Sequence, residues 1–126
     1  VWGSFLAKTM VAVMTPFIHL RSAEVDIVLK DTIFSLNDYG ISGRIVYTPG
    51  HTVGSVSILL DSGEAIVGDM AMNSLPMRFS PGLPIFAENL PQLIESWRKL
   101  LEEGVKSIYP SHGGSFSPDI MRKAVS

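Results

Sequence analysis

Three residues of types that bind metal ions each follow a short apolar segment ending in glycine or proline. They are His51, Asp69 and His112, in the strings IVYTPGH, AIVGD and SIYPSH. Neutral imidazole nitrogens and carboxylate oxygens suit Zn²⁺, and also Fe or Mn. A histidine or aspartate in a turn is more often a solvated turn former or a helix cap, so each position alone predicts little. The metal-site interpretation depends on whether the fold brings the three together.

The segment that carries the first two of these residues predicts a meander of three strands. Short apolar runs bounded by turn residues are typical of strands. The sequence Asp61-Ser62-Gly63 suits a tight hairpin turn. The strands are expected over residues 43–47, 55–60 and 64–67. The first and third then run in the same direction, and the two candidate ligands that follow them lie at one edge of the sheet.

The clearest helix is expected over residues 90–103, where apolar side chains recur on one face. Asn89 stands where an N-cap residue belongs, and Gly104 where a left-handed residue ends a helix. The chain then enters a strand over residues 106–109. A strand–helix–strand connection makes the joined strands parallel. His112 is therefore expected at the rim that the other two candidate ligands share.

The flanking segments have weaker signals. Residues 4–14 favour an apolar-striped helix, and Ser117-Pro118 opens a final one. Residues 25–36 predict two short strand segments. Residues 70–87 predict an irregular, lid-like loop, and its larger side chains either line an apolar substrate pocket or pack the loop on its own domain. Those side chains are Met70, Met72, Met77, Phe79 and Phe86.

Composition bounds the class of protein. The 126 residues are 46% hydrophobic and 17% charged, with a net charge of −2 and no cysteine. We expect one α/β (α+β) domain over residues 1–126, with a helical segment over 1–24 and a sheet with covering helices over 25–126. The absence of a basic cluster argues against nucleic acid and membrane surfaces as partners, and the apolar start is too interrupted to span a bilayer. A disulfide-free chain is compatible with the cytoplasm, the compartment that we predict.

The strings TPGHTVGS at 48–55, GD at 68–69 and PSHGG at 110–114 resemble, in order and spacing, the last three ligand motifs of the metallo-β-lactamase superfamily. The resemblance implies half of an αββα sandwich, the C-terminal half, with a mainly antiparallel mixed sheet and flanking helices. It also implies a two-metal site, usually zinc. His51 would be a ligand of the first metal, Asp69 the bridging and catalytic carboxylate, and His112 a ligand of the second metal.

The family's H-x-H-x-D-H motif, which supplies the other ligands, is absent from this chain. The only other histidine, His19, lacks that spacing and is interpreted as a surface or interface residue. Ser111 stands where glycine is common in the family. We therefore expect a fragment of a metal-dependent hydrolase that uses a metal-bound hydroxide, with little or no activity alone because metal binding is weak or absent. The alternatives are a non-catalytic assembly or binding module and a di-iron redox protein.

The missing half also has a consequence for partners. The sheet face that would meet that half is expected to be bare, and bare apolar faces usually find a partner. We predict a homo-oligomer, or association with the missing N-terminal half. The substrate of the intact protein is expected to be a small molecule, and the sequence does not select among the activities of the family.

Overall fold

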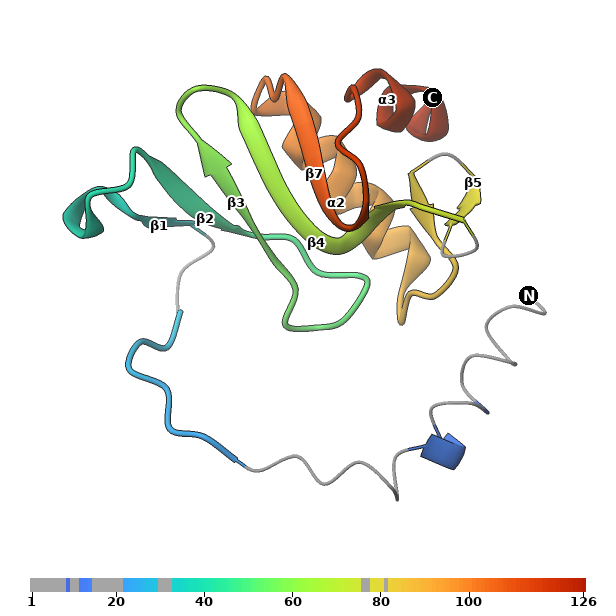
Figure 1. Ribbon diagram of the computed structural model, residues 1–126, viewed down its shortest axis with the longest axis horizontal. Coiled ribbons are helices and arrows are strands. Elements are labelled where there is room, and N and C mark those ends of the chain that lie inside the picture. The colour runs from blue at the N-terminus through green and yellow to red at the C-terminus, as the bar shows by residue number, and fades with distance from the viewer. Residues whose placement is uncertain (1–8, 10–11, 15–21, 30–32, 76–77, 81) are drawn as a thin grey trace.

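The computed structural model describes residues 9, 12–14, 22–29, 33–75, 78–80 and 82–126. Within them, five strands form one mixed sheet in the order β1-β2-β3-β4-β7 (Figure 1). Strands β1 to β4 pair antiparallel, whereas β4 and β7 pair parallel. The predicted α+β fold, with its meander and helical crossover, is confirmed. The strands are β1 (Ile33–Ser35), β2 (Gly43–Tyr47), β3 (Val56–Leu60), β4 (Glu64–Asn73) and β7 (Ser107–Gly113).

Smaller elements connect and flank this sheet. A 3₁₀ turn, η2 (Asn37–Tyr39), joins β1 to β2, and a two-stranded hairpin of β5 (Arg78–Ser80) and β6 (Leu83–Pro84) follows β4. Helix α2 (Leu90–Glu102) makes the crossover to β7, and α3 (Asp119–Val125) lies near the C-terminus. No helix in the described ranges is long and apolar enough to cross a membrane.

Helix α2 begins and ends where the sequence predicts. The Asn89 side chain accepts a hydrogen bond from the backbone N–H of Gln92, which satisfies one of the free donors of the first turn. Gly104 takes φ 73° after the last turn. Leu90 is one of the apolar residues of this segment, but it is 49% exposed, and burial begins at Leu93. The side chains of α2 that are buried are Leu93, Ser96, Trp97 and Leu100.

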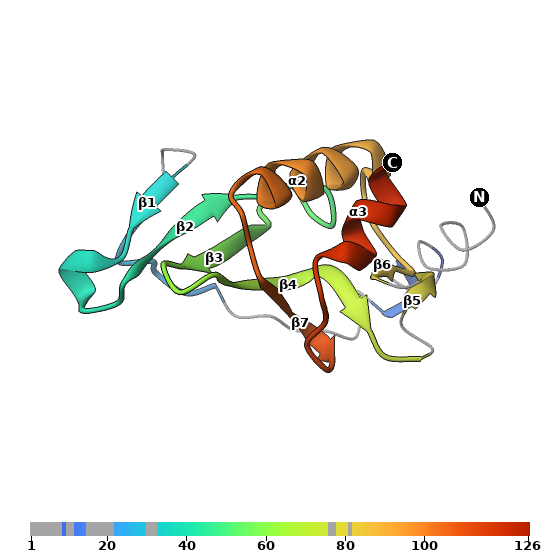
Figure 2. The same ribbon diagram turned by 90° about the horizontal axis from the view of Figure 1, so that it is seen from above.

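Both helices cover the same face of the sheet (Figure 2). Helix α2 lies along β2 to β4, and α3 lies beside the N-terminal half of α2. The core lies between them and the sheet, and Trp97 is its largest fully buried side chain. The indole N–H of Trp97 donates to the carbonyl of Met70 at 2.9 Å, which satisfies both polar groups inside the core. Strand residues that point toward the helices are buried, notably Val46, Leu59, Ala65, Val67 and Ile108.

A row of large apolar residues crosses the opposite face of the sheet. Each member is the direct cross-strand partner of the next, from β1 through to β7. Ile66 and Tyr109, on the two parallel strands, remain 45% and 43% exposed. The face that the sequence predicts to be bare is thus apolar and accessible at these two positions. The row consists of Phe34, Ile45, Ile58, Ile66 and Tyr109.

Helix α3 is held at its start by hydrogen bonds of Asp119. Its carboxylate accepts from the Arg122 guanidinium at 2.6 Å and from the Ser117 hydroxyl at 3.0 Å. These two donors, Arg122 first, lower the pKa of Asp119 below its ordinary value. The Ser117 hydroxyl also accepts from the Asp119 backbone N–H. The helix starts one residue later than predicted, because Pro118 takes the N-cap position and no side chain caps the helix there.

The two strands that carry candidate ligands are longer than predicted. Strand β4 does not stop at Gly68 but passes through it, with φ 59°, and continues to Asn73. Strand β7 likewise passes Pro110 and ends at Gly113. Glycine and proline interrupt the pairing instead of ending it, since the β4–β7 register shifts between Ile66 and Met72. The added residues of β4 and β7 pair with each other in the parallel pair, so each strand is longer because the other is there to pair with it.

One further prediction from the sequence, a strand at residues 25–29, needs correction. Residues 25–29 form no strand, and the sheet begins at Ile33. The alternation of apolar residues there is not used for burial, since Val25 and Val28 are 69% and 65% exposed. In the predicted helix 4–14, residues 9 and 12–14 are helical, and the rest lies outside the described residues, as does His19.

The expected loop 70–87 is largely structured. Its start belongs to β4, and the β5–β6 hairpin follows. Met70 and Met72 are 1% and 3% exposed, so these two methionines pack into their own domain instead of lining a pocket. Met77 and the side chain of Phe79 lie outside the described residues.

Candidate functional site

The three candidate ligands come together at one rim of the sheet. Nε2 of His51 lies 3.8 Å from Oδ2 of Asp69, and Nε2 of His112 lies 3.5 Å from Oδ1 of the same carboxylate. Each carboxylate oxygen therefore faces a different imidazole. His51 comes from the turn between β2 and β3, and the other two come from the parallel pair β4 and β7. The juxtaposition that the topology predicts is present.

The Asp69 carboxylate has the features of a group that lacks a partner. Oδ1 is shielded from solvent and has no hydrogen-bond partner. Both imidazole separations exceed the usual length of an N–H···O hydrogen bond, about 2.7–3.2 Å. Two ligand atoms that share a tetrahedral ion with bonds of about 2.0–2.2 Å lie about 3.3–3.6 Å apart, close to the separations found. A buried polar atom without a partner is costly, so the carboxylate favours a positively charged ligand.

Gly68 determines how Asp69 enters this site. Its positive φ of 59° is a conformation that glycine adopts without penalty. The pairing of β4 with β7 is irregular on both sides of Gly68. After the irregularity, Met70, Ala71 and Met72 are all buried, so the alternation of the strand is broken. Asp69 stands at this break, with its side chain 39% exposed.

His112 lies opposite Met72 on β7, close to the end of the parallel pair. The next residue, Gly113, has φ 99°, and a side chain there would meet the backbone of Asn73 at 2.4 Å. The two strand ends are thus packed backbone against backbone beside His112. The Asn73 side chain also donates to the carbonyl of Gly114 at 3.0 Å, which ties the two ends together.

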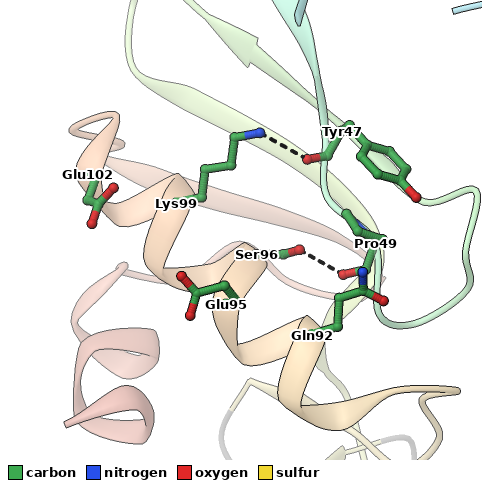
Figure 3. Close-up of a pocket in the computed structure, with 7 residues that line it drawn as sticks. All are labelled: Tyr47, Pro49, Gln92, Glu95, Ser96, Lys99 and Glu102. Carbon is green, nitrogen blue, oxygen red and sulfur yellow. Dashed lines mark hydrogen bonds between the residues drawn. The ribbon is translucent and has the colours of Figure 1, made fainter. Parts of the chain in front are cut away.

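Helix α2 anchors the chain that leads into His51. The Ser96 hydroxyl donates to the carbonyl of Pro49 at 2.7 Å in a buried position, and the Lys99 ammonium donates to the carbonyl of Tyr47 at 3.3 Å (Figure 3). These contacts border a cavity of about 340 Å³ between α2 and the end of β2. None of its lining residues belongs to the rim trio. They are Tyr47, Pro49, Gln92, Glu95, Ser96, Lys99 and Glu102.

The donor set fits a metal ion in chemical type and placement but not in number. Within the residues that the structure describes, no group of three or more His, Cys, Asp or Glu side chains is arranged to hold an ion. The two imidazoles contact opposite oxygens of Asp69, so neither side of the carboxylate has more than one histidine. A structural or catalytic zinc needs three or four protein ligands. Any ion at this rim therefore needs ligands in addition to these three residues.

Sequence reasoning missed Phe86, the residue that orients His51. The backbone carbonyl oxygen of Phe86 lies 2.9 Å from Nδ1 of His51 and accepts a hydrogen bond from it. The Phe86 ring meets the imidazole edge-on at 5.7 Å. Backbone partners carry no side-chain signature, so only a register prediction for residues 82–89 would have identified this contact.

Compared with known proteins, the chain matches no model of a protein family. The chain is similar to a Beta-lactamase-like protein 2 homolog of Drosophila melanogaster, with 31% identity over 74 residues. That alignment covers 59% of the chain and 23% of the relative, so the chain spans about a quarter of that protein.

Solved structures agree with this similarity. An archaeal metallo-β-lactamase superfamily protein from Sulfolobus tokodaii matches 94% of the chain with a TM-score of 0.64 and 25% identity. A protein solved in a di-iron-bound form matches 90% with a TM-score of 0.60 and 16% identity. The chain covers 46% and 54% of these two proteins, about half of each.

The fold and the matched segments define a metallo-hydrolase-like half-sandwich. The chain's predicted resemblance to the metallo-β-lactamase superfamily is confirmed by the curated relative and the solved structures together.

Proposed function

We propose that this chain supplies one half of the metal site of a metal-dependent hydrolase. His51, Asp69 and His112 would be its metal ligands, with Asp69 placed between two ions. The single observation that carries the proposal is the Asp69 carboxylate, whose two oxygens face two different imidazoles while Oδ1 has no hydrogen-bond partner. A bound divalent ion would act as a Lewis acid and generate a nucleophile from water near neutral pH.

We further propose that the isolated chain binds metal weakly and does not turn over substrate. Only three donor residues meet at the rim, which is too few for two complete ligand shells. The solved structures that it resembles are about twice as long, which is consistent with further ligands lying outside this chain. Zinc is the expected metal, with iron or manganese as alternatives for this donor set.

Metal titration tests the ligand assignment. We expect calorimetry with ZnCl₂ to detect weak binding to the unaltered chain and none to Asp69→Asn, which keeps the shape of the side chain but removes its charge. Asp38→Asn, at an exposed aspartate in η2, is the matched control and should bind as the unaltered chain does. Equal binding by Asp69→Asn would refute the assignment.

Turnover assays test the hydrolase proposal itself. The chain is incubated with zinc and with chromogenic lactone, thioester, β-lactam and phosphodiester substrates. We expect hydrolysis no faster than that of Asp69→Asn, and much faster hydrolysis of one substrate class by a longer polypeptide that includes the remaining half. Full activity of the short chain would contradict the fragment proposal, and a fully active Asp69→Asn variant of the longer protein would contradict the role of Asp69.

The apolar row on the open sheet face supports a proposal about partners. We infer that this face packs against the remaining half of the sandwich, and that chains without that half associate with one another through it. Ile66 and Tyr109 are the accessible members of the row. Light scattering should find an oligomer that Ile66→Lys dissociates, because a buried unpaired charge is costly. A monodisperse monomer at high concentration would contradict self-association.

One observation favours a second candidate, a non-catalytic assembly or binding module. No complete set of metal-holding side chains exists in the described part of the chain. In that case the longer polypeptide would also lack hydrolytic activity and would retain no stoichiometric metal, which elemental analysis measures.

A further inference from the structure

A short segment before helix α2, residues 86–89, is hydrogen-bonded along its length to the turn that carries His51. The backbone N–H of Glu88 donates to the carbonyl of His51 at 3.1 Å, and that of Asn89 donates to the carbonyl of Gly50 at 2.9 Å. The Glu88 carboxylate accepts from the backbone N–H of Val53 at 3.1 Å. The backbone on both sides of the imidazole is therefore held by one segment.

The same segment determines which imidazole nitrogen of His51 carries hydrogen. Nδ1 lies 2.9 Å from the carbonyl oxygen of Phe86. A carbonyl oxygen only accepts hydrogen bonds, so Nδ1 must be the protonated nitrogen of the neutral ring. Nε2 then has a free lone pair, and this is the nitrogen that faces Asp69. The Phe86 ring, edge-on to the imidazole at an interplanar angle of 89°, restricts rotation of the histidine.

His112 provides a contrast within the same site. Its side chain is 44% exposed, whereas that of His51 is 15% exposed. Among the described residues, no hydrogen bond reaches Nδ1 of His112. One histidine of the rim is thus oriented by the fold, and the other is not.

We infer that residues 86–89 are a positioning strap that fixes His51 in the Nδ1–H tautomer and presents Nε2 as a lone-pair donor toward Asp69. Phe86 and Glu88 are its positioning residues, and among the described residues the ion pairs of Asp69 are with His51 and His112, not with Glu88. The identity of the metal ion that Nε2 would bind there rests on the proposed function, but the tautomer of His51 and the cause of that tautomer do not. A ligand whose orienting hydrogen bond is in place binds metal more strongly than one without it.

The test is a long-range ¹H–¹⁵N correlation spectrum of the full chain, labelled with ¹⁵N and free of metal, at a pH where the imidazoles are neutral. His19→Gln in all samples leaves two histidines to assign. We expect His51 to be almost entirely the Nδ1–H tautomer and His112 to be a mixture of both. A mixture or the Nε2–H form at His51 would overturn the inference, whatever the metal titration shows.

Variants then test whether the strap is the cause. Glu88→Ala combined with Phe86→Ala should shift His51 toward the mixture shown by His112, whereas Glu88→Gln, which still accepts from Val53, should retain the single tautomer. Glu102→Ala, at an exposed glutamate at the far end of helix α2, is the control and should change nothing. An unchanged His51 tautomer in a folded double variant would refute the role of the strap. If the double variant does not fold, the same comparison is made with Phe86→Leu, which removes only the aromatic edge and should increase the second tautomer.

Metal affinity provides a separate readout. If the unaltered chain binds zinc, the double variant should bind it about 10–100-fold more weakly, as is usual when an outer partner of a ligand is lost. Failure of all zinc binding would refute the proposed function and leave the tautomer result in place. Equal zinc binding by the double variant and the unaltered chain would refute the positioning role.

Discussion

Replacing Gly50 by alanine tests how the turn that carries His51 is held against helix α2. Gly50 has φ 133°, a backbone conformation that residues with a side chain rarely adopt. A Cβ there would lie 2.3 Å from the backbone nitrogen of Leu93 and 2.4 Å from its Cα. Both atoms belong to a helix backbone that is held by its own hydrogen bonds. Either the turn or the first part of α2 must therefore move.

The cost is the sum of two effects. Backbone strain at such a φ costs about 1–3 kcal/mol, and forcing extra volume into packed structure costs about 1–3 kcal/mol. The free energy of unfolding should therefore fall by about 2–6 kcal/mol. In a domain of this size, even the lower bound should reduce Tm by about 6 °C.

Gly54→Ala is the matched control, in the same turn and with the same change. A Cβ at Gly54 meets nothing within 4 Å, and its φ lies outside the range that disfavours side chains. Its unfolding free energy should change by at most about 0.5–1 kcal/mol. Thermal unfolding followed by circular dichroism compares both variants with the unaltered chain. Equal Tm values for Gly50→Ala and Gly54→Ala would refute the close approach of the turn to α2.

Three further changes have expected outcomes. Trp97→Phe removes the indole donor and leaves the buried Met70 carbonyl unpaired, so chemical denaturation should show a loss of about 1–3 kcal/mol, and an unchanged midpoint would contradict that bond. Gly113→Ala, which places a Cβ 2.4 Å from the backbone of the adjacent strand, should lower Tm far more than Gly114→Ala, whose Cβ meets nothing within 4 Å. Asp119→Asn should destabilise the chain at neutral pH. Because the pKa of Asp119 is lowered in the folded state, its stabilisation exists above the ordinary pKa of an aspartate and is lost as the pH falls, so the two unfolding curves should converge in acid, and a pH-independent difference would contradict this origin.

Much of the fold could be predicted because its signals are local. The caps of α2 at Asn89 and Gly104, and the hairpin turn that ends at Gly63, depend only on neighbouring residues. The direction of each strand followed from these connections, and with it the meeting of the three candidate ligands. How far the pairing of strands β4 and β7 extends was not predictable in this way. Whether a strand continues beyond Gly68 or Pro110 depends on a neighbour far along the chain.

Only part of the candidate site could be predicted from the sequence. Ligand-type side chains identify themselves by residue type, but their supports are mostly backbone groups. The carbonyl of Phe86 and that of Pro49, which the Ser96 hydroxyl contacts, have no signature in the sequence. Apolar alternation at residues 25–29 misled because alternation predicts a strand only where another strand is available to pair with it.

The left-handed turn at Gly68 has a consequence for how this site tolerates change. In a regular strand, position 69 would share the orientation of Ala65 and Val67, which face the helices. A regular strand with the same sequence would therefore direct the Asp69 carboxylate into the hydrophobic core. Replacing Gly68 with a β-branched residue, or adding or deleting one residue beside it, would exchange inward and outward positions downstream. The site thus depends on a single backbone angle as much as on the aspartate itself.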